Sequence, residues 1–287
     1  MKTEAIWRTE GEDKRAAVRG MFSHIARGYD RMNGLMSLGL HHRWRTFSVS
    51  KLELQPGDRA LDVCCGTGDF ILPLRRAVGS KGQVIGVDFC LPMLEGAMEK
   101  FRNSPLLSGG EGAGVEGAPN YPEPQAISQK GLQGSRPSPP APSPPERRGE
   151  FRTALALGDA CRLPIASESF DAVSVGWGLR NVPDVETALR EAARVLKKGG
   201  RFVSLDMARP ENVVVRKTAE FTLRRALPLL GRLLRLGGDA YAYLPESTLR
   251  FASRETLAAA MERAGFVDVA YRDLMLGNLC VHWGRKP

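Results

Sequence analysis

The strongest constraint on the fold is an alternation of short apolar runs and helical segments in the first half of the chain. Arg59–Val63 is an apolar run that ends at a glycine cluster, and Phe70–Val78 after it is expected to form a helix. Gln83–Asp88 and Leu91–Phe101 repeat the same strand and helix order. Parallel strands need a crossover helix between them. The alternation therefore predicts βαβ units and a parallel sheet with helices on both faces.

The second half of the chain continues this order. Thr153–Leu157, Ala172–Val175 and Arg201–Asp206 are expected to be strands, and Asp184–Lys197 a helix. The turn Lys197-Lys198-Gly199-Gly200 predicts a basic last turn and a glycine stop for that helix.

The two ends of the chain complete the expected architecture. A helix over Arg254–Ala264 precedes two strands, Val267–Arg272 and Leu279–Trp283, which we expect to close the sheet in antiparallel fashion. Residues 1–50 are expected to form a helical segment over the active site. The prediction is one α/β domain over residues 1–287, a mostly parallel seven-stranded sheet with helices on both faces and an antiparallel C-terminal strand.

Residues 104–150 differ from the rest in composition. They hold 10 of the 19 prolines and 8 of the 31 glycines. Such a segment buries too little apolar surface to offset its conformational entropy. We predict a disordered insert or an extended loop there, and the remaining residues are enough for a single domain.

The charge of the chain predicts an anionic partner. The formal net charge is +9, which suits a nucleic acid, a membrane surface or an anionic small molecule. Asn212–Gly238 mixes leucine, valine and phenylalanine with six basic residues and one acid. This composition favours a lid over residues 210–250 that also contacts a membrane surface transiently. No nucleic-acid-binding module is recognisable, so nucleic acid is not expected.

The location and the cysteines follow from similar evidence. No apolar run is long enough for a transmembrane helix, and the charged N-terminus lacks the apolar core of a secretory signal. We predict a cytoplasmic protein, peripheral at the inner face of the membrane. The five cysteines form no CxxC pair, so neither a disulfide framework nor a metal site is expected.

A glycine loop between the first strand and helix is the first candidate binding element. It spans Leu61–Asp69, in which Gly66 and Gly68 allow a tight turn and close approach of a ligand. The helix N-terminus behind the loop favours a carboxylate. The dinucleotide-binding fingerprint is Gly-x-Gly-x-x-Gly, and this loop has Ile71 in place of the third glycine. This difference disfavours a nicotinamide oxidoreductase.

Two acidic strand ends extend this element into a nucleotide site. Asp88 ends the second strand, where a carboxylate can accept both hydroxyls of a ribose. Gly158-Asp159-Ala160 follows the third strand, where the acid can contact an adenine amino group. Ligands of parallel sheets bind at the carboxyl ends of the strands, so these elements should face one cavity.

The order of these motifs resembles the class I S-adenosylmethionine-dependent methyltransferases over Ala60–Asp206, apart from the insert. Three other segments, Phe22–Asn33, Trp177–Val182 and Tyr243–Ser247, resemble the ubiquinone/menaquinone biosynthesis methyltransferases. The resemblance implies S-adenosylmethionine as cofactor and a lipid-tailed quinol as substrate. Members methylate a carbon of 2-demethylmenaquinol, giving menaquinol, or of a ubiquinone precursor. Cys64-Cys65 is more similar to the phylloquinone branch, which leaves the quinone open.

The resemblance also implies individual site residues. Asp62, Gly66 and Gly68 of the glycine loop belong to the cofactor site, and its usual cofactor positions fall on Thr67, Asp88, Asp159 and Ala160. A further cofactor position, usually serine, is Gly176 here, so a side-chain contact is expected to be lost.

The catalytic candidates are Arg180, Asn181 and Tyr29. A quinol ring carbon becomes nucleophilic when a ring hydroxyl loses its proton, which a nearby cation and hydrogen-bond donors favour. Arg180 is too basic to accept that proton, so we assign it electrostatic stabilisation. Tyr29, His24 and His42 are weaker candidates for substrate contact or proton transfer, and we expect the histidines to be structural.

Three other functions stay open at this point. They are an RNA methyltransferase, a nicotinamide oxidoreductase, and a cofactor-binding scaffold whose proline-rich insert recruits partners. The sequence also leaves a homodimer open.

Overall fold

The structure is a computed structural model that describes residues 11–37, 39–102, 152–222, 247–248 and 251–287. The insert predicted over 104–150 and the part of the predicted lid from 223 to 246 lie outside the described residues.

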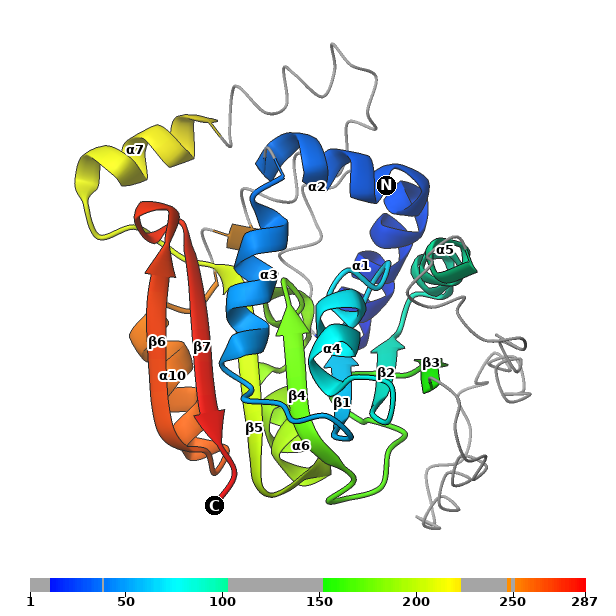
Figure 1. Ribbon diagram of the computed structural model, residues 1–287. Coiled ribbons are helices and arrows are strands. Elements are labelled where there is room, and N and C mark those ends of the chain that lie inside the picture. Colours follow the sequence, from blue (N-terminus) through cyan, green and yellow to red (C-terminus); the bar gives the residue numbers. More distant parts are fainter. Residues whose placement is uncertain (1–10, 38, 103–151, 223–246, 249–250) are drawn as a thin grey trace, which may run out of the picture.

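One seven-stranded sheet organises the chain, with the strand order β3-β2-β1-β4-β5-β7-β6 (Figure 1). β1 to β5 pair in parallel, whereas β7 is antiparallel to both β5 and β6. β6 therefore runs in the same direction as β1 to β5, and only β7 is reversed. The strands are β1 Arg59–Val63, β2 Gln83–Asp88, β3 Arg152–Leu157, β4 Phe170–Gly176, β5 Leu196–Met207, β6 Val267–Leu274 and β7 Leu279–Arg285. The predicted fold class is confirmed.

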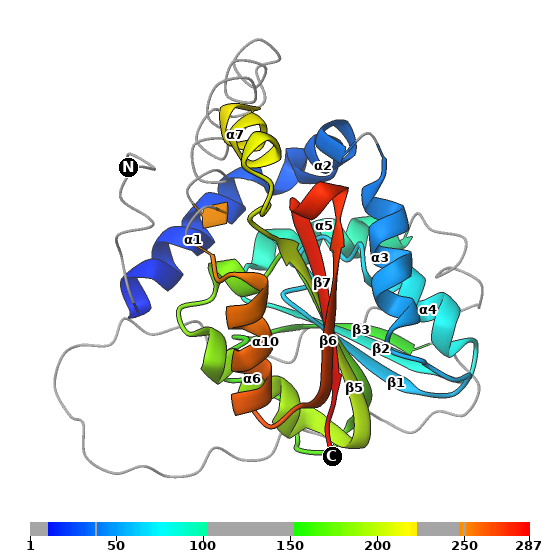
Figure 2. The same cartoon turned by 90° about the vertical axis from the view of Figure 1, so that its left-hand side faces the viewer.

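Helices cover both faces of this sheet. α3 and α4 lie on one face and α6 and α10 on the other, while α1 and α2 cross the end toward which the parallel strands run (Figures 1 and 2). The helices are α1 Gly11–Ile25, α2 Tyr29–Ser37, α3 His41–Ser50, α4 Ile71–Val78, α5 Leu91–Arg102, α6 Val185–Val195, α7 Val213–Phe221 and α10 Arg254–Arg263. The 3-10 turns in the described residues are η2 Ala26–Gly28, η3 Leu179–Asn181 and η5 Met275–Gly277.

The prediction of a helix as far as Lys197 was wrong. α6 begins after its N-cap Asp184, whose side chain accepts a hydrogen bond from the Thr187 N–H, and it ends at Val195. Leu196 is extended, with φ −71° and ψ 140°, and pairs with Phe170 of β4. Because Leu196 is fully buried in the core, it joins β5 instead of the last helical turn, and the predicted basic helix end belongs to a strand.

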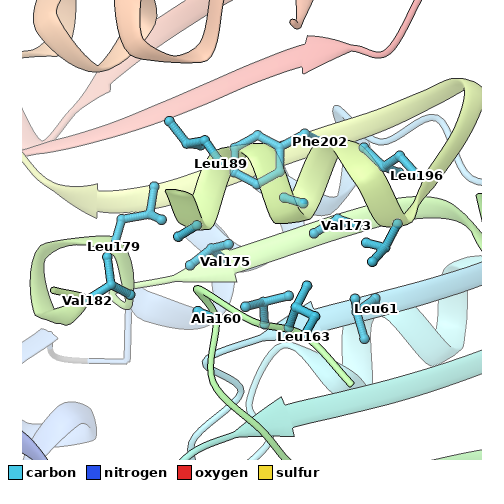
Figure 3. Close-up of a cluster of buried hydrophobic side chains, with 14 of the residues drawn as sticks. Leu61, Ala160, Leu163, Val173, Val175, Leu179, Val182, Leu189, Leu196 and Phe202 are labelled. Atoms are coloured by element: carbon cyan, nitrogen blue, oxygen red, sulfur yellow. The ribbon is translucent and has the colours of Figure 1, made fainter. Parts of the chain in front are cut away.

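Apolar side chains from both kinds of element form the core on the α6 and α10 face. Leu189 of α6 packs against the sheet with Leu61, Val173 and Phe202, and Ala160 lies at the edge of this cluster near the site (Figure 3). Leu61, Leu189 and Phe202 are fully buried. Full burial of such a side chain contributes roughly 1.5–3 kcal/mol. The packing therefore holds the strand ends that carry the site in fixed positions.

The described residues include no helix that combines the length and the hydropathy needed to cross a bilayer.

Candidate active site

A cavity opens at the carboxyl ends of β1, β2 and β4. In the sheet, β2 and β3 follow β1 on one side, whereas β4 and β5 lie on its other side, so the strand order reverses at β1. Ligands of such folds bind at this point of reversal, outside the carboxyl ends of the strands. The glycine loop, the β2 end, the turn after β3, the segment after β4 and the N-terminal helices all line it. The lining residues are Arg15, Phe22, Tyr29, Cys64, Gly66, Asp88, Phe89, Met93, Gly158, Asp159, Ala160, Gly176, Trp177, Gly178, Asn181, Val182 and Pro183.

The glycine loop needs its two glycines for conformation and space. Gly66 and Gly68 have φ of +54° and +79°, in the region that other residues rarely adopt. A Cβ at Gly68 would lie 2.6 Å from the ring of Phe101 on α5. The loop therefore turns tightly and keeps its backbone close to the cavity.

Asp88 is fixed at the bottom of the cavity by the backbone. Its two carboxylate oxygens accept N–H groups of Gly66 and Cys90, each at 2.9 Å. Burial raises the pKa of Asp88 to about 6, although the backbone donors oppose that shift. The carboxylate is mainly ionised at pH 7 and has lone pairs left for the hydroxyls of a ribose.

Asp62 lies deeper, on β1, and is buried with 1% of its surface exposed. The Ser174 hydroxyl donates to its Oδ1 at 2.7 Å, while Oδ2 has no hydrogen-bond partner among the described residues. Burial raises the pKa of Asp62 to about 7. Buried polar atoms are nearly always paired. Because Asp62 lines a pocket that adjoins the cavity, an N–H donor of a cofactor would complete its bonding.

Two predicted cofactor contacts are already paired with the N-terminal helices. Asp159 Oδ1 accepts the Cys161 N–H at 2.9 Å, and Oδ2 lies 2.6 Å from the Arg15 guanidinium of α1. The Thr67 hydroxyl donates to Asp30 of α2 at 2.5 Å. The sequence analysis missed Arg15 and Asp30, because nothing in their local pattern relates them to residues so distant in the chain.

An ion-pair cluster joins the glycine loop to the helices around it. Asp69 lies 2.8 Å from Arg45 Nη2 of α3 and 2.5 Å from Lys100 Nζ of α5, and Lys100 also lies 2.8 Å from Asp30. Burial alone would raise the pKa of Asp69, but these opposite charges outweigh it and lower the pKa. The Arg45 guanidinium lies 4.7 Å from the centroid of the Trp177 ring. Arg45 therefore connects the glycine loop with the segment after β4.

The segment after β4 carries two of the three predicted catalytic residues, Asn181 and Arg180, and of these two only Asn181 lines the cavity. Asn181 lines the cavity, and its side-chain amide donates to the Trp177 carbonyl at 3.0 Å. Arg180 is not among the lining residues, and its Nη1 donates to Asp206 Oδ1 at 2.6 Å, with both side chains buried. Tyr29, the third candidate, lines the cavity from α2; burial raises the pKa of its hydroxyl and the nearby Arg180 charge opposes the rise.

The family of the chain follows from comparison with known proteins. The model of the ubiE/COQ5 methyltransferase family matches residues 8–108 and 145–286, on both sides of the insert. The chain belongs to this family.

Its relatives cover nearly its whole length. A demethylmenaquinone methyltransferase of Desulfitobacterium hafniense (strain Y51) is 35% identical over 286 residues, covering 99% of this chain and 95% of the relative. One of Roseiflexus sp. (strain RS-1) is 36% identical over 275 residues, covering 96% and 95%. A solved SAM-dependent methyltransferase of Thermotoga maritima superposes with a TM-score of 0.56 at 21% identity, covering 94% of this chain and 100% of that one. The last likeness shows the shared fold.

In this member of the ubiE/COQ5 family, Gly176 is tied to a neighbouring aromatic ring. A Cβ at Gly176 would lie 2.3 Å from Cε2 of Phe70. The Phe70 ring occupies the space that a serine side chain would need. A side chain at position 176 would therefore clash with the Phe70 ring, and Gly176 lines the cavity with backbone atoms only.

The histidines of the N-terminal helices lie apart from the cavity lining. His24 and His42 are exposed, and the His42 ring stacks on His41 with centroids 3.9 Å apart. His41 is buried against Arg45, and burial together with that charge lowers the pKa of His41 to about 4. His41 is therefore neutral at pH 7.

Cys64 is the cysteine that faces the cavity. Its φ is +57°, and burial raises the pKa of its thiol well above the usual value. A thiol of raised pKa is a poor nucleophile. Cys64 therefore contributes to the shape of the loop more than to chemistry.

Proposed function

We propose that this protein transfers a methyl group from S-adenosylmethionine to a ring carbon of a lipid-tailed quinol, with 2-demethylmenaquinol as substrate and menaquinol as product. The observation that carries this proposal is a single cavity lined both by the acids Asp88 and Asp159 and by Tyr29 and Asn181. The first pair suits a nucleoside, and the second pair suits the oxygens of a quinol. The names of the full-length relatives favour the same reaction.

In this proposal, each part of S-adenosylmethionine has residues of the cavity that would hold it. Asp88 would accept the ribose hydroxyls, and the turn with Asp159 and Ala160 would hold the adenine. The glycine loop and the unpaired Oδ2 of Asp62 would hold the amino acid portion, whose ammonium supplies N–H donors. Gly176 would contribute backbone only. The bound cofactor supplies an electrophilic methyl group on a sulfonium.

The Arg15–Asp159 and Asp30–Thr67 contacts have a consequence for cofactor binding. Arg15 Nη2 lies 2.6 Å from Asp159, and the Thr67 hydroxyl 2.5 Å from Asp30. Arg15 belongs to α1 and Asp30 to α2. These two helices would therefore cover the positions proposed for the adenine and for the amino acid portion. Exclusion of water there would strengthen the electrostatic interactions within the site.

The quinol half positions hydrogen-bond donors among apolar side chains. Trp177 would provide apolar lining for a ring, while Asn181 and Tyr29 would provide polar groups for its oxygens. We infer that the positive charge of Arg180 reaches this region, because it lies near enough to Tyr29 to oppose the rise in the pKa of that hydroxyl. The same charge would lower the pKa of a quinol hydroxyl and so favour the nucleophilic ring. Asp206 holds Arg180 in place for this role.

A lipid-tailed substrate also implies where the protein works. We infer transient contact with the inner face of the membrane by an otherwise cytoplasmic protein.

The decisive experiment compares short-tailed, soluble quinols of three classes: 2-demethylmenaquinol, the phylloquinone precursor and the ubiquinone precursor. We expect the largest kcat/KM for 2-demethylmenaquinol. Asn181→Ala should lower kcat while cofactor affinity, measured by calorimetry, stays unchanged. A larger kcat/KM for another quinol would move the substrate assignment to that class. Cofactor binding without methylation of any of the three would refute the quinol assignment.

A further inference from the structure

The turn between β6 and β7 has an unusual backbone. Met275, Leu276 and Gly277 have φ of +48°, +57° and +88°, three consecutive residues in the left-handed region. Glycine adopts that region freely, whereas methionine and leucine do so at a cost in free energy. Strained backbone of this kind persists only where surrounding structure enforces it, and it gathers at functional positions.

The surrounding structure does enforce this turn. The Asn278 side-chain amide donates to the Met275 carbonyl at 2.8 Å, and the Ala208 N–H donates to the Asn278 carbonyl at 2.9 Å. A Cβ at Gly277 would lie 3.3 Å from Cα of Pro210, so the turn packs closely on the segment that leads into α7. The conformation is therefore built into the fold.

The strained turn presents apolar side chains to solvent. Leu276 is 81% exposed, more than any other large apolar side chain described, and Met275 is 47% exposed. α7 lies beside this turn in both views (Figures 1 and 2), and it exposes 73% of Val214 and 66% of Phe221. We call Val214, Phe221, Met275 and Leu276 the apolar patch; exposed apolar side chains gathered on neighbouring elements in this way are typical of an interaction surface.

Sheet topology places this patch on the same edge as the candidate active site. β6 runs parallel to β1 to β5, so the turn that follows it lies at the carboxyl edge, where the cavity opens. β6 is three strand positions from β4. At roughly 4.8 Å for each position, the patch lies about 14 Å from the cavity wall. A lipid tail leaving the cavity can span that distance.

The charges around the patch suit an anionic surface. The basic residues of segments 208–222 and 271–278 are Arg209, Arg216, Lys217 and Arg272, and the acids are Glu211, Glu220 and Asp273. Two of the acids, Glu211 and Asp273, form ion pairs with Arg254 and are thus partly neutralised. Apolar tips flanked by basic groups are the pattern of interfacial membrane binding.

We propose that Met275 and Leu276, together with α7, form a docking surface for an anionic phospholipid bilayer. Leu276 and Met275 enter the interfacial layer, and the neighbouring basic residues contact the headgroups. The cavity then faces the bilayer, from which a lipid-tailed quinol reaches it. This inference rests on the proposed function for its purpose, but the surface is tested without the substrate.

The test uses the full chain and replaces both tip residues with asparagine. Asparagine tolerates the left-handed region, so M275N/L276N keeps the turn while removing the apolar tip. The matched control is Leu157→Asn, which changes a 38% exposed leucine on β3, the strand at the other lateral edge of the sheet from β6. Binding is measured by co-sedimentation with vesicles of equal parts phosphatidylglycerol and phosphatidylcholine, and by the melting temperature of each variant.

We expect the unaltered chain and the Leu157 control to bind these vesicles equally. M275N/L276N should bind roughly tenfold or more weakly, since burial of a leucine alone corresponds to such a factor. Its melting temperature should be unchanged or higher, and its turnover of a soluble short-tailed quinol unchanged. Equal binding by the tip variant, or no binding by the unaltered chain, would overturn the proposal. Loss of a dimer in the tip variant, with vesicle binding intact, would assign the surface to a second copy instead. Vesicle binding by a chain that methylates no quinol would refute the proposed function and leave the docking surface standing.

Discussion

Replacement of Asp62 by asparagine separates the stability of the protein from its cofactor binding. Asp62 is buried, and its Oδ2 has no hydrogen-bond partner among the described residues. Asparagine has nearly the same shape and can still accept the Ser174 hydroxyl through its carbonyl oxygen. The substitution therefore removes a buried charge with little change in packing.

The size of the effect follows from the pKa of Asp62, which is about 7 in the folded protein against 3.8 for an ordinary aspartate. At about 1.4 kcal/mol for each pKa unit, burial of the ionised group costs about 4 kcal/mol. Because the folded pKa is raised, this loss of stability begins above pH 3.8 and is complete above pH 7. Of this loss of unfolding free energy, about 3 kcal/mol occurs between pH 5 and pH 7, above which the stability no longer changes through Asp62.

The assay is urea unfolding of both proteins at pH 5 and pH 8.5. Asp62→Asn should be more stable than the unaltered chain at pH 8.5, and the difference in unfolding free energy should shrink by about 3 kcal/mol at pH 5. Cofactor affinity should fall about tenfold or more, because a charge-assisted hydrogen bond is lost. The same free-energy difference at both pH values would refute the reasoning about burial. Unchanged cofactor affinity would remove Asp62 from the site.

Three further substitutions test other parts of the site. Asp88→Ala should raise the Kd of S-adenosylmethionine about 100-fold by calorimetry, since two ribose hydrogen bonds to a charged group are lost, and equal affinity would contradict its assignment. Arg180→Ala should spare cofactor binding, depress turnover and cost about 3 kcal/mol in urea unfolding, because the buried Asp206 loses its counter-charge. Asp206→Asn in the same background should restore stability. If the restored protein also regained turnover, Arg180 would have no electrostatic role. Gly176→Ser should cost about 1–3 kcal/mol because its Cβ meets Phe70, and Phe70→Leu should relieve that cost; an unchanged melting temperature would show that the ring moves freely.

The sheet was predictable because each strand is a local pattern. The apolar run Arg59–Val63 lies just before the glycine loop and Gln83–Asp88 ends at an aspartate, and the observed strands have these same bounds. The end of α6 was not predictable in this way. Leu196 suits a helix by propensity, but its pairing with Phe170 across a distance of 26 positions decides for a strand.

The site shows the same division between local and distant contacts. The glycine loop and Asp88 could be located from spacing alone, and they do meet at 2.9 Å. Two ion pairs of the site could not be predicted in this way: Arg15 with Asp159, and Arg180 with Asp206. In each pair the residues come from different elements, and only the fold brings them together. The predicted roles of the site residues stay predictions until they are tested by substitution.

The most direct measurement of the central proposal uses S-adenosylmethionine with a deuterated methyl group and reduced, short-tailed 2-demethylmenaquinol. The product is analysed by mass spectrometry with fragmentation of the ring. We predict one deuterated methyl group on a ring carbon of the quinol, and none when Asp88→Ala replaces the unaltered chain at low cofactor concentration. A label on a quinol oxygen, or no labelled quinol from a chain that binds the cofactor, would contradict the proposal.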